Sequence, residues 1–275
     1  MVGRLLLRGL IVGLLAALLA FGFAKVYGEP SVEKAIAFET AMDSAKVAAT
    51  DAAPSAAKDG AGTADAAAMP PTGSHAASEP ELFSRATQSG LGLFTGLMVY
   101  GTAFGGLFAL VFAFAWGRMG RLGPRGTAAV LALLTFIAVI LVPGLKYPPN
   151  PPSVGEADTI MLRTQLYFAM LVLSALGMVL AVWVANRLRA QFGVWTATIL
   201  AGAALVAGLA VVTWALPGID EVPEGFPASL LWQFRIAAWG IQAVLWAGIG
   251  LGFGIAAEQV LMRRTGALDR GYRPI

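Results

Sequence analysis

Six stretches of the chain are almost entirely apolar and are long enough to cross a membrane as helices. A membrane-spanning α-helix needs about 20 consecutive apolar residues, and the apolar residues here form continuous runs and not the alternation of barrel strands. The pattern therefore predicts an all-α integral membrane protein with six transmembrane helices. Their expected ranges are 5–27, 90–116, 127–142, 164–185, 194–216 and 230–260.

A polar stretch separates the first two apolar runs. Its start, residues 29–39, has apolar positions at helical spacing, which predicts a short amphipathic helix. Residues 48–80 are rich in Ala, Gly, Ser and Pro, and we expect them to be largely disordered because they bury too little apolar surface. The organisation predicted is a first transmembrane helix at 1–27, an outer loop at 28–88, a five-helix membrane region at 89–262 and a cytoplasmic tail at 263–275.

The first apolar run has a second interpretation, as a signal peptide. Arg4 and Arg8 precede it, and residues 22–24 (Gly-Phe-Ala) offer a cleavage site. The run is long for the apolar core of a signal peptide, so a retained transmembrane helix is the favoured interpretation.

Charge placement predicts the orientation of the helices. The chain is 57% hydrophobic and only 13% charged, whereas soluble chains are about 25% charged. The sequence pI of about 9.4 is compatible with nucleic-acid binding, but the basic residues lie in short clusters beside helix ends, which is a topology signal. Arginines gather at the N-terminus, in the second and fourth links and in the tail, whereas most acids lie in the other links. We therefore expect three hairpins with outer loops and both termini in the cytoplasm.

Two of the outer links resemble each other. Each follows an apolar run that ends in Pro-Gly, at residues 143–144 and 217–218, and each leads into a helix with an arginine near its start, Arg163 or Arg235. This indicates a weak internal repeat of the last two hairpins. Because prolines reduce the entropy lost on ordering, such loops favour a fixed shape over a flexible tether.

Arg235 is the ionisable residue that lies deepest in a predicted helix. Charged groups in a membrane span are costly and usually functional. Arg235 either extends its charge outward to the interface or pairs with Asp220, Glu221 or Glu224 in the preceding link, and the pair is the favoured interpretation. Lys146 either anchors the helix at the interface or pairs with these outer acids. The residues assigned a structural role in the outer loops are Lys146, Tyr147, Pro148 and Arg235.

Small residues four apart predict close helix contacts, because such pairs let helix backbones approach each other in lipid. Packing within the chain is the favoured interpretation, and a glycine-lined path or partner surface is the alternative. Gln165, Gln233 and Gln242 either bond between helices or line a polar path, and a polar path would favour transport. The glycine pairs are Gly9/Gly13, Gly92/Gly96, Gly101/Gly105, Gly248/Gly252 and Gly250/Gly254.

Several kinds of chemistry are excluded by the residues present. The chain has no cysteine and one histidine, His75, so neither a thiolate site nor a cluster of imidazoles forms within it. No nucleophile–base constellation and no glycine-rich nucleotide-binding motif occurs, so we predict a protein that is not an enzyme. If it transports, the energy comes from an ion gradient or another subunit.

Four segments carry a resemblance to a known family. They are the end of the first helix at residues 23–30 together with residues 35–39, the Gly-Gly-Leu-Phe at 105–108, and the links at 142–152 and 220–227, the last running into Leu-Trp-Gln-Phe-Arg at 231–235. With these segments the chain resembles the CbtA family of predicted cobalt transporter subunits. The resemblance covers nearly the whole chain apart from residues 48–80.

The resemblance implies cobalt uptake for cobalamin synthesis, across the bacterial inner (cytoplasmic) membrane. It implies Co²⁺ as substrate with no permanently bound cofactor, and a partner that resembles CbtB, a small membrane protein with histidines. The polar loop is histidine-rich in many relatives, whereas here it holds only His75. No nucleic-acid partner is expected, and an oligomer is possible.

Carboxylates are the metal donors that the outer segments offer. Co²⁺ favours imidazole and carboxylate donors, and carboxylates alone bind weakly and select poorly. We hypothesise that the acids attract a divalent cation electrostatically and that the histidine partner supplies selectivity. Alternatively, the acids form salt links with Lys146 and Arg235, and the chain is a scaffold that transports nothing. The candidate metal residues are Glu29, Glu33, Glu39, Asp220, Glu221 and Glu224.

Overall fold

The fold is all-helical throughout the part of the chain that the structure describes. The structure is a computed structural model, and it describes residues 2–51, 84–120 and 122–271. His75 and most of the predicted disordered loop lie outside these residues. The elements are α1 (Val2–Phe23), the π-helix η1 (Ala24–Gly28), α2 (Glu29–Asp51), α3 (Arg85–Thr87), the π-helix η2 (Gln88–Gly92), α4 (Leu93–Ala115), α5 (Pro124–Thr135), the π-helix η3 (Phe136–Leu141), α6 (Val142–Lys146), the 3₁₀ turn η4 (Ala157–Thr159), α7 (Ile160–Ala215) and α8 (Ala228–Gly271).

Five helices of the described chain are long and apolar enough to cross a membrane. The fourth of them, α7, has 56 residues and turns sharply at Gly193, where the backbone angles are φ 75° and ψ 167°. Positive φ is a conformation that glycine adopts at little cost. The two arms lie side by side: Leu205 of the second arm is within 3.1 Å of where a side chain at Gly177 of the first would begin. The fourth and fifth apolar runs are thus the two arms of α7.

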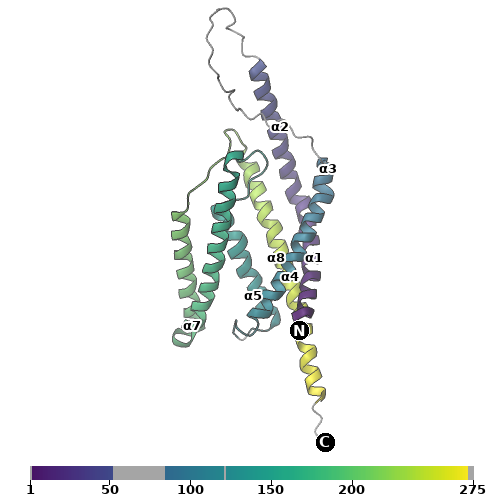
Figure 1. The fold of residues 1–275 in the computed structure, drawn as a ribbon, viewed down its shortest axis with the longest axis vertical. Coiled ribbons are helices and arrows are strands. Elements are labelled where there is room, and N and C mark those ends of the chain that lie inside the picture. The colour runs from purple at the N-terminus through teal and green to yellow at the C-terminus, as the bar shows by residue number, and fades with distance from the viewer. Residues whose placement is uncertain (1, 52–83, 121, 272–275) are drawn as a thin grey trace, which may run out of the picture.

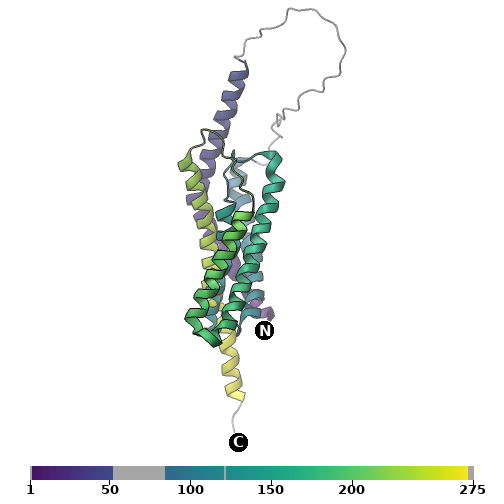
Figure 2. The same cartoon turned by 90° about the vertical axis from the view of Figure 1, so that its left-hand side faces the viewer.

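The helices are elongated along one direction, and the links between them gather at two ends (Figure 1). The start of α1, the link from α4 to α5, the turn at Gly193 and the end of α8 lie at one end. The segments 147–159 and 216–227 lie at the other, where α2 projects past the bundle (Figure 2). The links therefore alternate between the two ends.

The closest helix contact is between α1 and α4. A side chain added at Gly13 would begin 2.1 Å from the carbonyl oxygen of Gly101, and one at Gly105 would begin 2.2 Å from that of Gly9. No residue larger than glycine fits at such distances, so the two backbones touch directly. The predicted pairs Gly9/Gly13 and Gly101/Gly105 therefore pack against each other.

Helix α8 joins α1 to α5 through the other small residues. Gly248 faces Ala16 of α1, whereas Gly250 faces Ala132 of α5. Aromatic rings fill the remaining space, with Phe253 packed edge-to-face on the rings of Phe108 and Phe112 at centroid distances of 5.4 and 5.1 Å. The expectation of packing fails for the pair Gly92/Gly96. Among the described residues, a side chain at Gly92 would meet only the carbonyl of Thr87 in its own helical run, and one at Gly96 would meet nothing within 4 Å.

Polar contacts fasten the arginine-bearing end of this bundle. The Arg8 guanidinium donates to the carbonyl of Ala256 at 2.7 Å and to Gln259 Oε1 at 3.0 Å. Arg125 and Glu258 form an ion pair at 2.6 Å, which joins α5 to α8. Helices α1, α4, α5 and α8 therefore form one closely packed unit, called here the glycine bundle.

Three helices extend beyond their predicted ends. Helix α2 continues from α1 through the π-helix η1 and reaches Asp51, well past the short amphipathic helix expected at 29–39. Helix α8 continues to Gly271, past the expected end near residue 260, and the first arm of α7 runs past residue 185 to the turn at Gly193. In the last case the sequence 186–192 contains no Gly or Pro that would end a helix earlier.

Candidate functional site at the proline-loop end of the helices

A cavity of about 670 Å³ lies between the two proline-containing loops and the helices beneath them, and we call it the outer cavity after the side predicted for these loops. The first proline loop is residues 147–159 and the second is residues 216–227. Both loops line the cavity, together with α7, α8 and the Ile140–Gly144 region. On α8 the lining residues run from Arg235 to Gln242, which is about 10 Å along a helix that rises 1.5 Å per residue. The cavity thus reaches from the loops into the level of the apolar helices.

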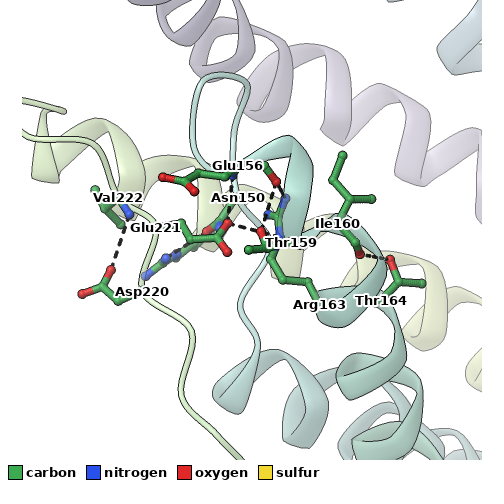
Figure 3. Close-up of polar contacts among 10 residues, drawn as sticks. Asn150, Glu156, Thr159, Ile160, Arg163, Thr164, Asp220, Glu221 and Val222 are labelled. Atoms are coloured by element: carbon green, nitrogen blue, oxygen red, sulfur yellow. Dashed lines mark hydrogen bonds and ion pairs between the residues drawn. The ribbon is translucent and has the colours of Figure 1, made fainter. Parts of the chain in front are cut away.

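Glu221 fastens the second proline loop to the first (Figure 3). Its Oε2 accepts a hydrogen bond from the backbone N–H of Glu156 at 3.0 Å and lies 3.2 Å from Nε of Arg163. Arg163 also donates to the carbonyl of Glu156 at 3.1 Å. We call Glu221, Arg163 and Glu156 the outer clasp, after the side predicted for these loops. It joins the start of α7 to the loop that follows the end of α7.

Gly155 makes room for the outer clasp. Its backbone has φ 120°, and a side chain there would begin 2.3 Å from a terminal nitrogen of Arg163. The Arg163 side chain therefore lies directly on the peptide backbone of the loop. A residue with a side chain at position 155 would displace the guanidinium and strain the backbone.

Arg235, which follows the second proline loop, bonds the first one. Its guanidinium donates to Asn150 Oδ1 in the first proline loop at 3.0 Å. The expected ion pair of Arg235 with Asp220, Glu221 or Glu224 is absent from the ion pairs of the described residues, and Glu221 bonds Arg163 instead. Each arginine that follows one proline loop thus bonds the other loop. This crosswise arrangement is consistent with the predicted repeat of the two hairpins.

The remaining loop residues reinforce the link between the two loops. The Tyr147 hydroxyl donates to the carbonyl of Pro217 at 2.8 Å, and burial raises the pKa of Tyr147, so it remains a donor at neutral pH. Pro148 lines the cavity beside it. The ammonium of Lys146 lies 5.8 Å from the centroid of the Tyr147 ring, and no ion pair joins it to an acid within the described ranges.

The environment of Glu221 stabilises its charged form. The side chain is only 9% exposed. Hydrogen bonds from the Thr159 hydroxyl and from the backbone N–H of Glu156, together with the charge of Arg163, hold the pKa of Glu221 below its ordinary value. These contacts outweigh desolvation, which acts in the opposite direction. Glu221 is therefore a carboxylate throughout the physiological pH range.

A small apolar cluster above the cavity gives the loops a fixed shape. Ala35 of α2, Val154 of the first loop and Phe226 of the second are buried together with Leu230. The ring of Phe38 packs edge-to-face on Phe226 at 5.1 Å. Helix α2 therefore packs on both proline loops.

The family model of CbtA, described as a probable cobalt transporter subunit, matches residues 2–258. The chain belongs to the CbtA family. The match spans α1 to the greater part of α8, and so includes both proline loops and every residue that lines the cavity. No curated protein and no solved structure matches the chain.

The acids singled out as cobalt ligands of this CbtA-family chain lie in different environments. Glu29 is 11% exposed and forms an ion pair with Arg85 at 2.7 Å, a partner that the sequence pattern did not indicate. The described residues contain no group of three His, Asp or Glu side chains that could hold a metal ion. The acids that remain exposed are Glu33, Glu39, Asp220 and Glu224.

The three glutamines singled out in this CbtA-family chain also lie in different environments. Gln242 lines the outer cavity, together with Tyr167 and Thr164. Gln165 and Gln233 are exposed on other faces of their helices. Of the three glutamines, Gln242 lines the cavity beside the proline loops, and Gln233 lines a separate groove between α8 and the start of α2.

Proposed function

We propose that the chain is the membrane permease subunit of a cobalt uptake system that supports cobalamin synthesis. One observation carries the proposal: a cavity at the outer end extends about 10 Å along α8 and has polar side chains on its wall down to Gln242. A protein that only holds a complex together has no need of a polar cavity at this depth, since polar groups among apolar helices are costly. The proposed activity is transport and not catalysis.

The proposed topology is six transmembrane helices in three hairpins, with the two arms of α7 counted separately and residues 28–88 on the outside. Arg8 lies within the first two turns of α1, Arg118 and Arg125 flank or lie in the link from α4 to α5, and Arg187 lies six residues before the turn at Gly193. These parts of the chain gather at the same end of the helices as the end of α8 (Figure 1). Basic residues favour the cytoplasmic side, so both termini are proposed to be cytoplasmic, in the bacterial inner membrane.

The exposed acids are proposed to raise the local concentration of cations at the cavity. Asp220 and Glu224 are exposed on the second proline loop, and Glu33 and Glu39 on α2, which packs on that loop. Carboxylates in one region attract divalent cations without coordinating them tightly. A CbtB-like partner with histidines is proposed to supply the selective ligands, because Co²⁺ favours imidazole.

A second candidate function is an accessory subunit that transports nothing. The pairing of Glu29 with Arg85 and of Glu221 with Arg163 supports it, because these acids then serve to fix the loops. The two candidates differ in what the exposed acids do. Only the permease requires them for the movement of cobalt.

The experiment is cellular uptake of radioactive cobalt with the chain alone, with the histidine partner, and with acids changed to alanine. Because Glu221 belongs to the outer clasp, the informative variant is Asp220→Ala/Glu224→Ala, which leaves the clasp intact. The permease predicts uptake that needs the partner and falls several-fold in this variant, with a stronger fall at low ionic strength, since salt screens exposed charges.

A matched control removes an acid that has no proposed role at the cavity. Asp43 forms an exposed pair with Lys46 farther along α2, so Asp43→Ala, compared with Glu224→Ala, tests whether any loss of negative charge on this side suffices. Uptake that is unchanged by every variant and independent of the partner would reject the permease in favour of the accessory subunit.

A further inference from the structure

A groove of about 400 Å³ runs along the side of the molecule, between α8 and the helical run that passes from the end of α1 through η1 into α2. It shares no lining residue with the outer cavity. The groove is open to the surroundings, since Val26, Tyr27 and Trp232 in its lining are between 61% and 64% exposed. It therefore offers a binding surface to a molecule outside the chain.

The two halves of this groove differ in polarity. The half nearer the proline loops is polar, with Ser31, Lys34 and Gln233 in its lining. The half nearer the middle of the helices is lined by apolar side chains alone, namely Phe23, Val26, Ile236 and Ala237. A molecule that matches both halves has a polar end and an apolar end, as a membrane lipid does.

The change of polarity falls at the level of a membrane interface. Between Arg8 and Lys25 the chain has no charged residue, and this stretch is about 26 Å long at 1.5 Å per residue. The hydrocarbon core of a bilayer is about 30 Å thick, so its boundary on the side of the proline loops lies near Lys25. Tyr27 and Trp232, on the two walls of the groove, are side chains typical of that boundary. The apolar half of the groove therefore faces acyl chains, and the polar half faces headgroups.

Lys34 places a positive charge at the headgroup level. Side chains on a helix lean toward its N-terminus, so Lys34 on α2 leans back toward the membrane boundary. Helix α8 runs in the opposite direction (Figure 1), so its Gln233 leans toward the proline loops and the same level. Lys34 is the one charged residue in the lining, whereas its neighbour Glu33 is not part of it. Within the described part of the chain, no hydrogen bond or ion pair engages Lys34 or Gln233.

We propose that this groove binds an anionic phospholipid of the surrounding bilayer, in the leaflet nearest the proline loops. The phosphate lies at the ammonium of Lys34 and the amide of Gln233, and an acyl chain lies along the apolar half. A headgroup with negative charge alone suits this lining, because the ammonium of a zwitterionic headgroup meets no acid there. The lipid contacts both walls of the groove, and it thus joins the start of α2 to α8.

The test is native mass spectrometry of the purified full-length chain in detergent, with phosphatidylglycerol and phosphatidylcholine of the same acyl chains as probes. We expect phosphatidylglycerol to bind several-fold more tightly than phosphatidylcholine. Lys34→Gln should weaken the binding of phosphatidylglycerol by about fivefold, the contribution of one lysine near an anionic surface, and leave phosphatidylcholine unaffected. Trp232→Phe keeps a ring and removes the N–H at the headgroup level, and a smaller loss is expected for it.

Matched controls separate this groove from the rest of the membrane interface. Lys25→Gln removes a lysine near the same boundary that donates to the carbonyl of Ser89 and is not in the groove lining. Trp214→Phe makes the tryptophan change at an exposed position near the end of α7, on the side of the proline loops. Both variants are expected to bind phosphatidylglycerol normally.

Thermal unfolding in detergent provides a second readout. A ligand that binds only the folded chain stabilises it, so phosphatidylglycerol should raise the unfolding temperature of the wild type. The increase should be smaller for Lys34→Gln and unchanged for Lys25→Gln. Added salt should reduce the increase in the wild type, because mobile ions screen an exposed charge pair.

Three results would overturn the inference. Equal binding of the two lipids would show that headgroup charge plays no part, and equal losses in Lys34→Gln and Lys25→Gln would show that the groove plays none. Soluble glycerol 3-phosphate that binds as tightly as phosphatidylglycerol would show that the apolar half is not used. None of these measurements involves cobalt, so the inference and the proposed function stand or fall separately.

Discussion

The glycine bundle and α7 differ in how they are held. In the bundle, α1, α4, α5 and α8 touch through backbone and small side chains, and aromatic rings fill the gaps. Helix α7 has its main contacts with α6, η3 and η4 only, and at the outer end it is fastened by the polar outer clasp. Lipid provides no hydrophobic force between helices, so close packing stabilises the first region and specific hydrogen bonds position the second.

This difference indicates which helices would cost the least free energy to displace. A displacement within the bundle would have to separate packed backbones, whereas a displacement of α7 would require only that a few polar contacts exchange partners. The outer cavity lies between the two regions, with α8 on one wall and α7 on the other. Three variants test the comparison, in order of decreasing effect.

The largest effect is expected for Gly105→Val. Its side chain would overlap the backbone of α1, so we expect a loss of about 3 kcal/mol or more of unfolding free energy. Thermal unfolding in detergent measures it. The control is Gly202→Val in the second arm of α7, where a side chain meets nothing within 4 Å among the described residues. Similar losses for the two variants would contradict the comparison.

An intermediate effect is expected when the outer clasp is titrated. Because the pKa of Glu221 is lowered in the folded state, its contribution is present above the unfolded pKa and is lost as pH falls through the folded pKa. Amide exchange at residues 156–163, corrected for intrinsic rates, should therefore show constant protection from pH 8 to about pH 5 and a loss below the ordinary carboxyl pKa of about 4.5.

Thr159→Val sharpens this test, because the Thr159 hydroxyl is the largest cause of the lowered pKa. The loss of protection should move to higher pH in this variant. Thr164→Val is the control, since its hydroxyl bonds only within its own helix, to Ile160. A pH profile that is the same in Thr159→Val and the wild type would count against the role given to Thr159.

The smallest effect is expected for Ser174→Ala. The buried Ser174 hydroxyl on α7 donates to the carbonyl of Ala138 in the π-helix η3, and this is one of the few polar bonds between α7 and the rest. Hydrogen bonds between membrane helices contribute about 0.6 kcal/mol on average, so a loss of about that size should appear in thermal unfolding. Thr198→Val, which removes a bond within one helix, should have a smaller effect.

The sequence predicts the apolar helices and their packing residues well, because both depend on local pattern. Apolar length indicates a membrane helix, and glycines four apart indicate a close contact, as Gly101 and Gly105 confirm. The turn at Gly193 was also within reach of the sequence, since residue 193 is the first glycine after residue 177. The three π-helices were not, because an extra residue in a turn leaves no periodic signal.

The site was harder to predict, because its contacts join residues far apart in the chain. Glu221 and Arg163 are 58 positions apart by their numbers, and nothing local distinguishes Arg163 from Arg235 as the partner of Glu221. The similarity of the two proline loops was the available signal. It indicated that Arg163 and Arg235 have corresponding roles, but it did not indicate that each arginine bonds the loop of the other hairpin. The three tryptophans at 232, 239 and 246 illustrate the same limit: they are spaced by seven, yet the first is exposed and the last is buried.

The straight course of α2 has an electrostatic consequence for the acids that it bears. At 1.5 Å per residue, Glu33 lies about 6 Å and Glu39 about 15 Å farther from the bundle than Glu29. Mobile ions at physiological strength screen exposed charges over about 8 Å. Glu39 therefore exerts little force on an ion near Glu29, and a helix that stays rigid over this distance divides its carboxylates into independent charges at separate heights.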